Sequence, residues 1–224
     1  YVMSSSFKET FTHEIEYKEK SPINWKKFHT HLLKYDPNCL IHGTFLEEIG
    51  GRLRVTRALS GFVEANNVFV AESGGVKNNR VQPGLKGGEG NVPFHRTEFT
   101  AEKITAYFSL DLSLLRAYGL GEDATQLLIA LSLFKIRRFL STGLRLRTAC
   151  DLTMADGIQV TKPANFDLPA EADLLAECKA KIQSCKPLFA DPAVTEVIWE
   201  PSKKKSKEKE EEEEEGTENN AEDK

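Results

Sequence analysis

All ten arginines of this 224-residue chain lie between Arg52 and Arg147. Residues 51–150 contain 14 lysines and arginines against 8 acidic residues, although the whole chain has a formal net charge of −4. The arginine guanidinium is a planar fork of hydrogen-bond donors that matches phosphate oxygens and base edges. We therefore expect a surface for a polyanion in this part of the chain, with ordinary clustering of charge on a solvated face as the alternative.

Two pairs of arginines have the spacing of neighbours on one face of a β-strand. Arg52 and Arg54 alternate with apolar residues, and Arg145 and Arg147 do the same after Gly143. This period of two predicts strands with one basic face. Each pair could then contact successive phosphates of a single nucleic acid strand.

Arg137 and Arg138 stand near the end of a predicted helix. Cations at this position also complement the negative end of the helix dipole, so a structural role and a binding role are equally good interpretations.

Phe94, His95 and Arg96 place an aromatic ring beside a cation, a combination that stacks on and neutralises single-stranded nucleic acid. Burial of Phe94 in a core is an equal alternative. His95 is the one candidate for a general base, but the sequence shows no nucleophile or second acid to work with it. Contact with a ligand is therefore the favoured role of His95.

Several functions are excluded by missing patterns. The chain has neither a GxxxxGK[ST] phosphate loop nor a GxGxxG turn between a strand and a helix, and its five histidines and four cysteines lack metal-binding spacing. We expect no cofactor and no metal. The cysteines are too few and too irregular for a disulfide scaffold, which favours reduced thiols and a cytoplasmic protein, and no apolar run is long enough for a membrane span. The first residues do not form a signal peptide, so we expect the chain to begin inside a longer gene product.

Periodicity and turn residues predict a mixture of helices and strands. Predicted helices begin at Ser21-Pro22 and end before Asp36-Pro37, run from Gly121 to Gly143, and cover 174–182. Predicted strands cover 53–55, 62–65, 68–71, 104–112, 144–148 and 197–199, with a tight turn at Asn66-Asn67 joining the second and third. Because helices and strands do not strictly alternate, the pattern favours an α+β sandwich with helices against an antiparallel sheet.

A long segment without periodicity interrupts these elements. Residues 73–93 contain six glycines and two prolines, with Lys77, Arg80 and Lys86 among them. Such a segment inside a compact domain is more often functional or mobile than structural. Residues 201–224 begin with lysines and continue with six consecutive glutamates, a composition typical of disorder. We thus expect one domain over 1–200 and a disordered tail over 201–224.

Six stretches together resemble one known protein family: YDPNCLIHG (35–43), GGRLR (50–54), RALSGF (57–62), ESGGVK (72–77), GNVPFHRTE (90–98) and GLRLRTACDL (143–152). Their order and content are similar to the major backbone subunit of the type I-U (I-G) CRISPR surveillance complex, a member of the RAMP superfamily. The resemblance extends from about Trp25 to Leu152.

The resemblance implies a ferredoxin-like palm, which is a modified RNA-recognition motif, with inserted finger and thumb elements. It also implies that the N-terminal part of the domain is missing from this chain. The glycine-rich segment at about 73–93 matches the position of a thumb-like hairpin. The implied activity is non-catalytic: several copies stack on CRISPR RNA and present the guide to target DNA in antiviral defence, together with other subunits of the complex.

We retain two alternatives, a RAMP-type endoribonuclease that processes precursor CRISPR RNA with His95 as base, and a stand-alone module for single-stranded nucleic acid. For the scaffold, the expected RNA-binding residues are Arg52, Arg54, Arg57, Lys77, Arg80, Lys86, Phe94, His95, Arg96, Arg137, Arg138, Arg145 and Arg147.

Overall fold

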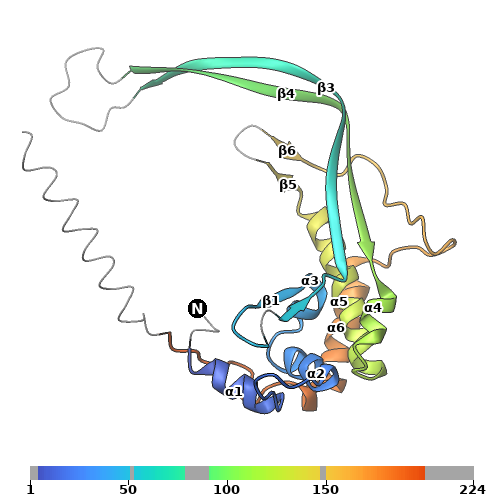
Figure 1. Ribbon diagram of the computed structural model, residues 1–224. Coiled ribbons are helices and arrows are strands. Elements are labelled where there is room, and N and C mark those ends of the chain that lie inside the picture. The colour runs from blue at the N-terminus through green and yellow to red at the C-terminus, as the bar shows by residue number, and fades with distance from the viewer. Residues whose placement is uncertain (1–4, 51–52, 79–90, 147–149, 200–224) are drawn as a thin grey trace, which may run out of the picture. The chain divides into compact units, whose positions relative to one another are not determined.

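The computed structural model describes residues 5–50, 53–78, 91–146 and 150–199. The chain divides into two compact units, one of residues 60–109 and one of the residues before and after them. The hairpin unit contains most of β3 (Leu59–Asn78) and β4 (Asn91–Leu110), which pair with each other (Figure 1). The remaining elements belong to the other unit, which we call the body. The predicted tail, 201–224, lies outside the described residues.

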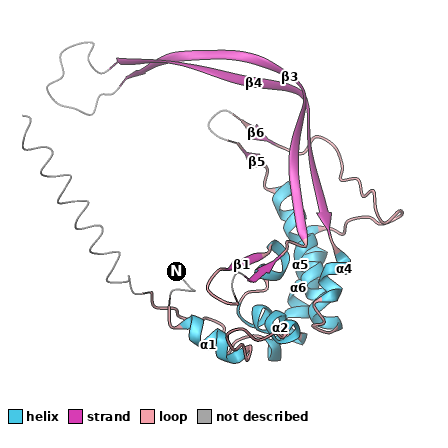
Figure 2. Cartoon of the chain, in the orientation of Figure 1, coloured by secondary structure: helices cyan, strands magenta, loops and turns pink. Residues whose placement is uncertain are grey.

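The body is built from helices and two short strand pairs (Figure 2). Its helices are α1 (Phe7–Glu14), α2 (Trp25–Tyr35), α3 (Asn38–His42), α4 (Leu112–Ala117), α5 (Glu122–Ser141) and α6 (Glu171–Ser184), followed by a 3-10 helix, Lys186–Leu188. Its strands are β1 (Thr44–Leu46), β2 (Leu53–Val55), β5 (Leu144–Arg145) and β6 (Asp151–Leu152). Among the described helices, none combines the length and apolar composition needed to cross a bilayer.

The α+β prediction is confirmed by this mixture of helices and antiparallel strand pairs. The ferredoxin-like palm is not confirmed, because the strands of the described residues form three separate two-stranded sheets. The predicted strand at 197–199 is absent, since these three described residues have no regular secondary structure.

Helix α2 confirms the apolar periodicity, with Phe28, Leu32 and Leu33 buried in the body core. The predicted start at Ser21-Pro22 is wrong. The helix begins at Trp25 because the Asn24 side chain caps it, accepting a hydrogen bond from the Lys27 backbone N–H at 3.1 Å.

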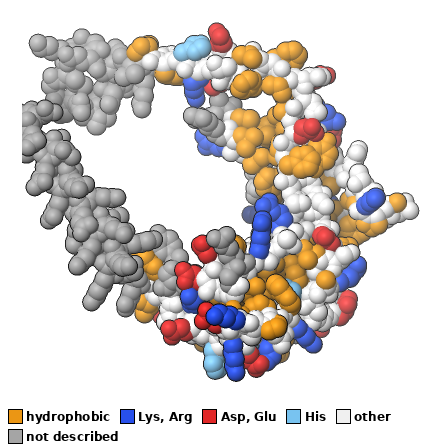
Figure 3. Space-filling view, in the orientation of Figure 1, with side chains coloured by type: hydrophobic (Ala, Val, Ile, Leu, Met, Phe, Trp, Pro, Cys, Tyr) orange, Lys and Arg blue, Asp and Glu red, His pale blue; other side chains and the backbone are white. Residues whose placement is uncertain are grey.

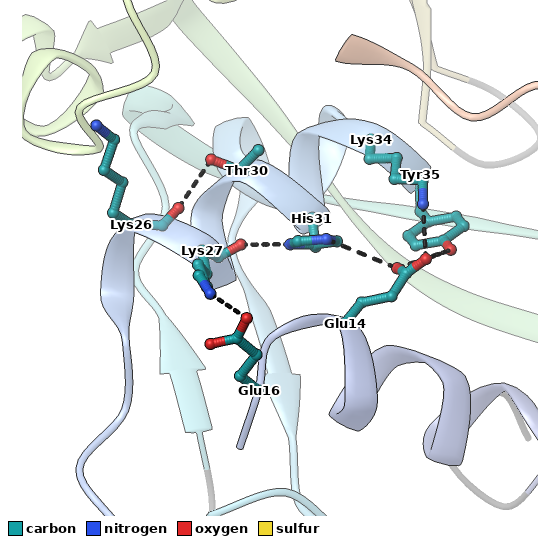
Figure 4. A network of polar contacts seen from close by, with 8 residues as sticks. All are labelled: Glu14, Glu16, Lys26, Lys27, Thr30, His31, Lys34 and Tyr35. Carbon is teal, nitrogen blue, oxygen red and sulfur yellow. Dashed lines mark hydrogen bonds and ion pairs between the residues drawn. The ribbon is translucent and has the colours of Figure 1, made fainter.

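A carboxylate network fastens α1 to α2 (Figure 4). Glu14 at the end of α1 accepts hydrogen bonds from Lys34 Nζ at 2.6 Å and from the Tyr35 hydroxyl at 2.8 Å. His31 Nε2 lies 3.9 Å from the same carboxylate, and Lys27 pairs with Glu16. Burial raises the pKa of Glu14, but the bonds from Lys34 and Tyr35 outweigh it, so the pKa of this carboxyl is lowered.

Gly43 joins α3 to β1 in a conformation that only glycine adopts easily. Its φ is +80°, and a Cβ at this position would lie 2.7 Å from the Val55 carbonyl oxygen. The close approach lets β1 pair with β2 immediately after the turn. Leu46 then faces Leu53 in register and both are buried.

The longest helix, α5, agrees with the sequence prediction. Glu122 and Asp123 stand in its first turn, Leu127 and Leu128 are buried, and Gly143 follows its end with a φ of +74°. Of the strand predicted over 144–148, β5 contains Leu144 and Arg145, Leu146 has no strand structure, and residues 147 and 148 lie outside the described residues. Helix α6 packs against α5, and Lys181 Nζ lies 3.0 Å from Asp123 Oδ1.

The hairpin unit corrects the prediction of two short strands with a turn at Asn66-Asn67. β3 continues through both residues and pairs with β4 instead. Asn67 does adopt a positive φ, +50°, as Asn tolerates, but its side chain donates to Glu102 Oε2 across the hairpin at 2.6 Å. Local turn propensity is overridden here by pairing with a distant segment.

Candidate nucleic-acid interface

The outward face of the β1–β2 pair carries one aromatic ring and one cation. Phe45 and Arg54 are direct cross-strand partners and both are exposed, whereas Leu46, Leu53 and Val55 point into the core. Arg57 is exposed just after β2. Among the described residues, no carboxylate lies within ion-pair distance of Arg54 or Arg57. The exposed position that the alternation predicted for Arg54 is confirmed. No carboxylate of the described residues competes with an anionic ligand for its guanidinium group.

Phe45 was missed by the sequence analysis because no strand was predicted at 44–46. Thr44, Phe45 and Leu46 show no alternation, because two apolar residues are adjacent. The exposed position of Phe45 becomes visible only from its pairing with Arg54.

The hairpin unit brings the predicted ring and cation together. The Arg96 guanidinium carbon lies 5.3 Å from the centre of the Phe94 ring, within cation–π range, and Arg96 Nε lies 3.7 Å from Glu98 Oε1. Residues 94, 96 and 98 are two apart in β4 and so share one face of the hairpin. Phe94 is 42% exposed, which excludes the alternative of core burial.

His95 points to the other face of the hairpin. Its Nε2 lies 3.8 Å from Glu72 Oε2, and both side chains are more than 60% exposed. A general base needs a positioned partner and a site that excludes water. Among the described residues, Glu72 and the exposed surface around His95 do not provide such a site.

Large apolar side chains lie exposed on both strands of the hairpin. Figure 3 shows hydrophobic side chains along this unit. The Phe62 and Tyr107 rings stack at 4.8 Å, and Gly61 lies against Phe108. These contacts and the Asn67–Glu102 bond define an antiparallel register. The large apolar residues that are at least 36% exposed here are Phe62, Val63, Val68, Phe69, Val70, Val76, Phe94, Phe99, Ile104, Tyr107 and Phe108.

Arg137 has an intramolecular role. Its Nε donates to the Pro169 carbonyl oxygen at 2.8 Å, and its Nη2 donates to the Leu168 carbonyl oxygen. Both carbonyls belong to the segment just before α6. Arg137 therefore links α5 to this segment. Its Nε and Nη2 groups, which could otherwise contact a phosphate, are used in these two bonds.

Arg138 also contacts α6, but it remains exposed. Its Nη1 lies 2.8 Å from Glu171 Oε1, and the Ser141 hydroxyl donates to the other oxygen of Glu171 at 2.6 Å. These bonds from Ser141 and Arg138 lower the pKa of Glu171. These contacts do not test RNA binding by either residue, but the bonds of Arg137 to backbone carbonyls favour its structural alternative, whereas RNA binding by Arg138 stays a prediction.

Arg145 is exposed in β5, directly across from Asp151 of β6. Arg52, Arg80, Lys86 and Arg147 lie outside the described residues, and Lys77 lies near the end of β3. The structure thus places Arg54, Arg57 and Arg145 on the body and Phe94, His95 and Arg96 on the hairpin unit.

Two groups of polar side chains in the body contain residue types that can act in catalysis, His42 with Lys135 and Cys39 with Asp36. Lys135 Nζ lies 2.7 Å from His42 Nε2 and 2.5 Å from Asn38 Oδ1, which ties α5 to α3. Burial and the Lys135 charge both lower the pKa of His42, so its ring is neutral at pH 7. Burial, aided by Asp36, raises the pKa of Cys39 to about 11, which keeps this thiol protonated and unreactive. Both groups have structural explanations.

The described residues show no metal cluster. No group of three or more His, Cys, Asp or Glu side chains among them could bind a metal ion. The best-formed pocket of the body has about 210 Å³, between the end of α5 and the start of α6, below the size of typical ligand pockets. Arg137 and Glu171, which line it, are already bonded to neighbouring elements. All four cysteines are free thiols.

A comparison with known protein families matches the N-terminal part of the chain. Residues 1–70 match the model of the Cas_GSU0053 family, described as CRISPR-associated protein GSU0053. This stretch contains α1 to α3, the β1–β2 pair and the first half of β3. The match supports a CRISPR-associated protein. No curated protein matches the chain.

Proposed function

We propose that this protein is a non-catalytic scaffold that binds CRISPR RNA in several copies and presents the guide for pairing with target DNA. The family match supports the CRISPR context, and the concentration of arginine between residues 52 and 147 supports an anionic ligand. Arg54, Arg57 and Arg145 are exposed cations of the body that fit this role.

The exposed hairpin is the observation that carries the proposal. Two strands of 20 residues each present large apolar side chains, and an isolated two-stranded hairpin is at best marginally stable in water. Val70 and Phe99 are both about two-thirds exposed. A patch of large apolar side chains with this exposure is typical of a binding surface. Nucleic acid bases and a second copy of the chain are surfaces that would cover these side chains.

Binding of this kind is independent of sequence. Arginines that contact phosphates fix the position of a nucleic acid without reading it, and a ring such as Phe94 stacks on any base. A scaffold for guides of any sequence needs this property. The target is then read by base pairing of the guide, a division of labour also used by other RNA-guided proteins.

The endoribonuclease alternative requires His95 to act as a base. The exposure of His95 and of Glu72, the carboxylate 3.8 Å from it, favours a binding role instead. Incubation with precursor CRISPR RNA in the absence of metal separates the two functions. The scaffold leaves the RNA intact, whereas the nuclease cleaves it in a reaction that His95→Ala abolishes.

Assembly on RNA of defined length tests the scaffold directly. Native mass spectrometry on guides lengthened in small steps should show whole numbers of copies that increase stepwise with RNA length. A double variant, Val70→Glu with Phe99→Glu, should load fewer copies, and the control Val194→Glu, equally exposed on the body, should load as many as the wild type. One copy per RNA at every length would instead support the stand-alone module.

A further inference from the structure

We infer that Phe45 is a base-stacking residue and that it acts together with Arg54 on one nucleotide of a single-stranded nucleic acid. This inference rests on the proposed RNA binding and adds a residue and a mode of contact to it. Phe45 is 54% exposed at the centre of β1.

The strand pair positions the ring and the cation side by side. Phe45 and Arg54 are directly opposite in the β1–β2 register, and direct cross-strand partners have Cβ atoms about 4.5–5.5 Å apart. The neighbours Leu46, Leu53 and Val55 anchor both strands in the core. Gly43 fixes the start of β1 through its close approach to the Val55 carbonyl. The two outward side chains therefore stand on a rigid base.

Charge distinguishes a nucleic acid from an apolar protein surface as the ligand. A protein surface that covered Phe45 would also remove water from Arg54 and from nearby Arg57. Burial of these charges would be unfavourable, because neither has a carboxylate partner among the described residues. The carboxylate of Glu48, beyond the end of β1, is already paired with Lys8 at 2.8 Å. A nucleotide supplies both a flat ring for Phe45 and a phosphate for Arg54.

The chemistry of the ring predicts the form of the ligand. Phenylalanine has no hydrogen-bonding group, so it accepts any base, and it stacks only on a base whose face is free. Bases inside a duplex are stacked on one another. The pair therefore favours unpaired nucleotides and shows no preference among sequences.

The test compares two labelled probes of equal length, an oligouridylate and the same ribose-phosphate chain without bases. Phe45→Leu should weaken oligouridylate binding about ten-fold, since stacking on one aromatic residue contributes about 1–3 kcal/mol. It should leave binding of the abasic chain and the salt dependence unchanged. Phe45→Trp should keep the affinity, and Phe166→Leu, an exposed phenylalanine of the body, should behave as the wild type.

Arg54→Ala should not distinguish between the two probes, because both contain the phosphate that Arg54 contacts. It should weaken both probes equally and flatten the slope of log affinity against log salt by about 0.7.

Three results would overturn the inference. The first is wild-type affinity of Phe45→Leu for oligouridylate, and the second is an equal loss for both probes, which would indicate an indirect effect through the fold. The third is unchanged RNA affinity with fewer copies per RNA, which would make this face a contact between copies. A wild-type protein that binds neither probe would refute the proposed function itself.

Discussion

Arg137 should stabilise the fold without contributing to RNA binding. Replacing it by methionine keeps most of its aliphatic body and removes the bonds to the Leu168 and Pro169 carbonyls. A hydrogen bond from a charged donor contributes about 1.5–3 kcal/mol, so two buried bonds would contribute at least about 3 kcal/mol, and the partial exposure of Arg137 reduces the expected sum to about 2–3 kcal/mol. For a chain of this size, about 2 kcal/mol corresponds to a Tm lower by about 4–8 °C.

Thermal unfolding followed by circular dichroism at 222 nm measures this change, because the helices of the body dominate that signal. Arg138→Met is the matched control. Its exposed pair with Glu171 is worth at most about 1 kcal/mol, so the Tm should fall by less than half as much. Affinity for RNA and its salt dependence, measured on the folded Arg137→Met protein, should equal those of the wild type. An unchanged Tm with a flatter salt slope would refute the structural role.

Three further predictions concern single positions. Gly43→Ala should lower the Tm more than Gly119→Ala. Both glycines have a positive φ, but of the two only position 43 would place a Cβ against backbone, 2.7 Å from the Val55 carbonyl oxygen. Equal decreases in Tm in a melting experiment would contradict this prediction. Because the pKa of Glu14 is lowered in the folded state, its stabilising effect is complete above about pH 4.5 and is lost as the pH falls through the folded-state pKa. The difference in unfolding free energy between wild type and Glu14→Gln, measured with urea, should therefore shrink below pH 4.5, and the exposed control Glu19→Gln should show no such difference. His95→Ala should weaken RNA binding only a few-fold, about 1 kcal/mol for one lost contact, and a loss above a hundred-fold in a filter-binding assay would show that His95 is central.

Periodicity was sufficient for α2 and α5, where apolar residues recur over three or more turns and face one core. It failed at Asn66-Asn67, since pairing of β3 with β4 is a long-range interaction that overrides local turn propensity. It also missed β1, where Phe45 and Leu46 are adjacent apolar residues and so do not alternate as Leu53, Arg54 and Val55 do in β2. At the candidate interface, the sequence indicated that Phe94 and Arg96 act together, and the geometry confirms their contact. The bonds of Arg137 to backbone carbonyls could not be predicted, because no residue type or spacing encodes them.

The salt dependence of RNA binding is the most direct test of the central claim that exposed arginines of this chain bind phosphates. Each phosphate contact on a single strand contributes about 0.7 to the slope of log affinity against log salt. Arg54→Ala with Arg57→Ala should therefore reduce the slope by about 1.4 and weaken unrelated RNA sequences equally. Lys179→Ala with Lys186→Ala, two exposed cations in the acidic C-terminal third, should leave the slope unchanged. Equal slopes for the two folded double variants would contradict the claim.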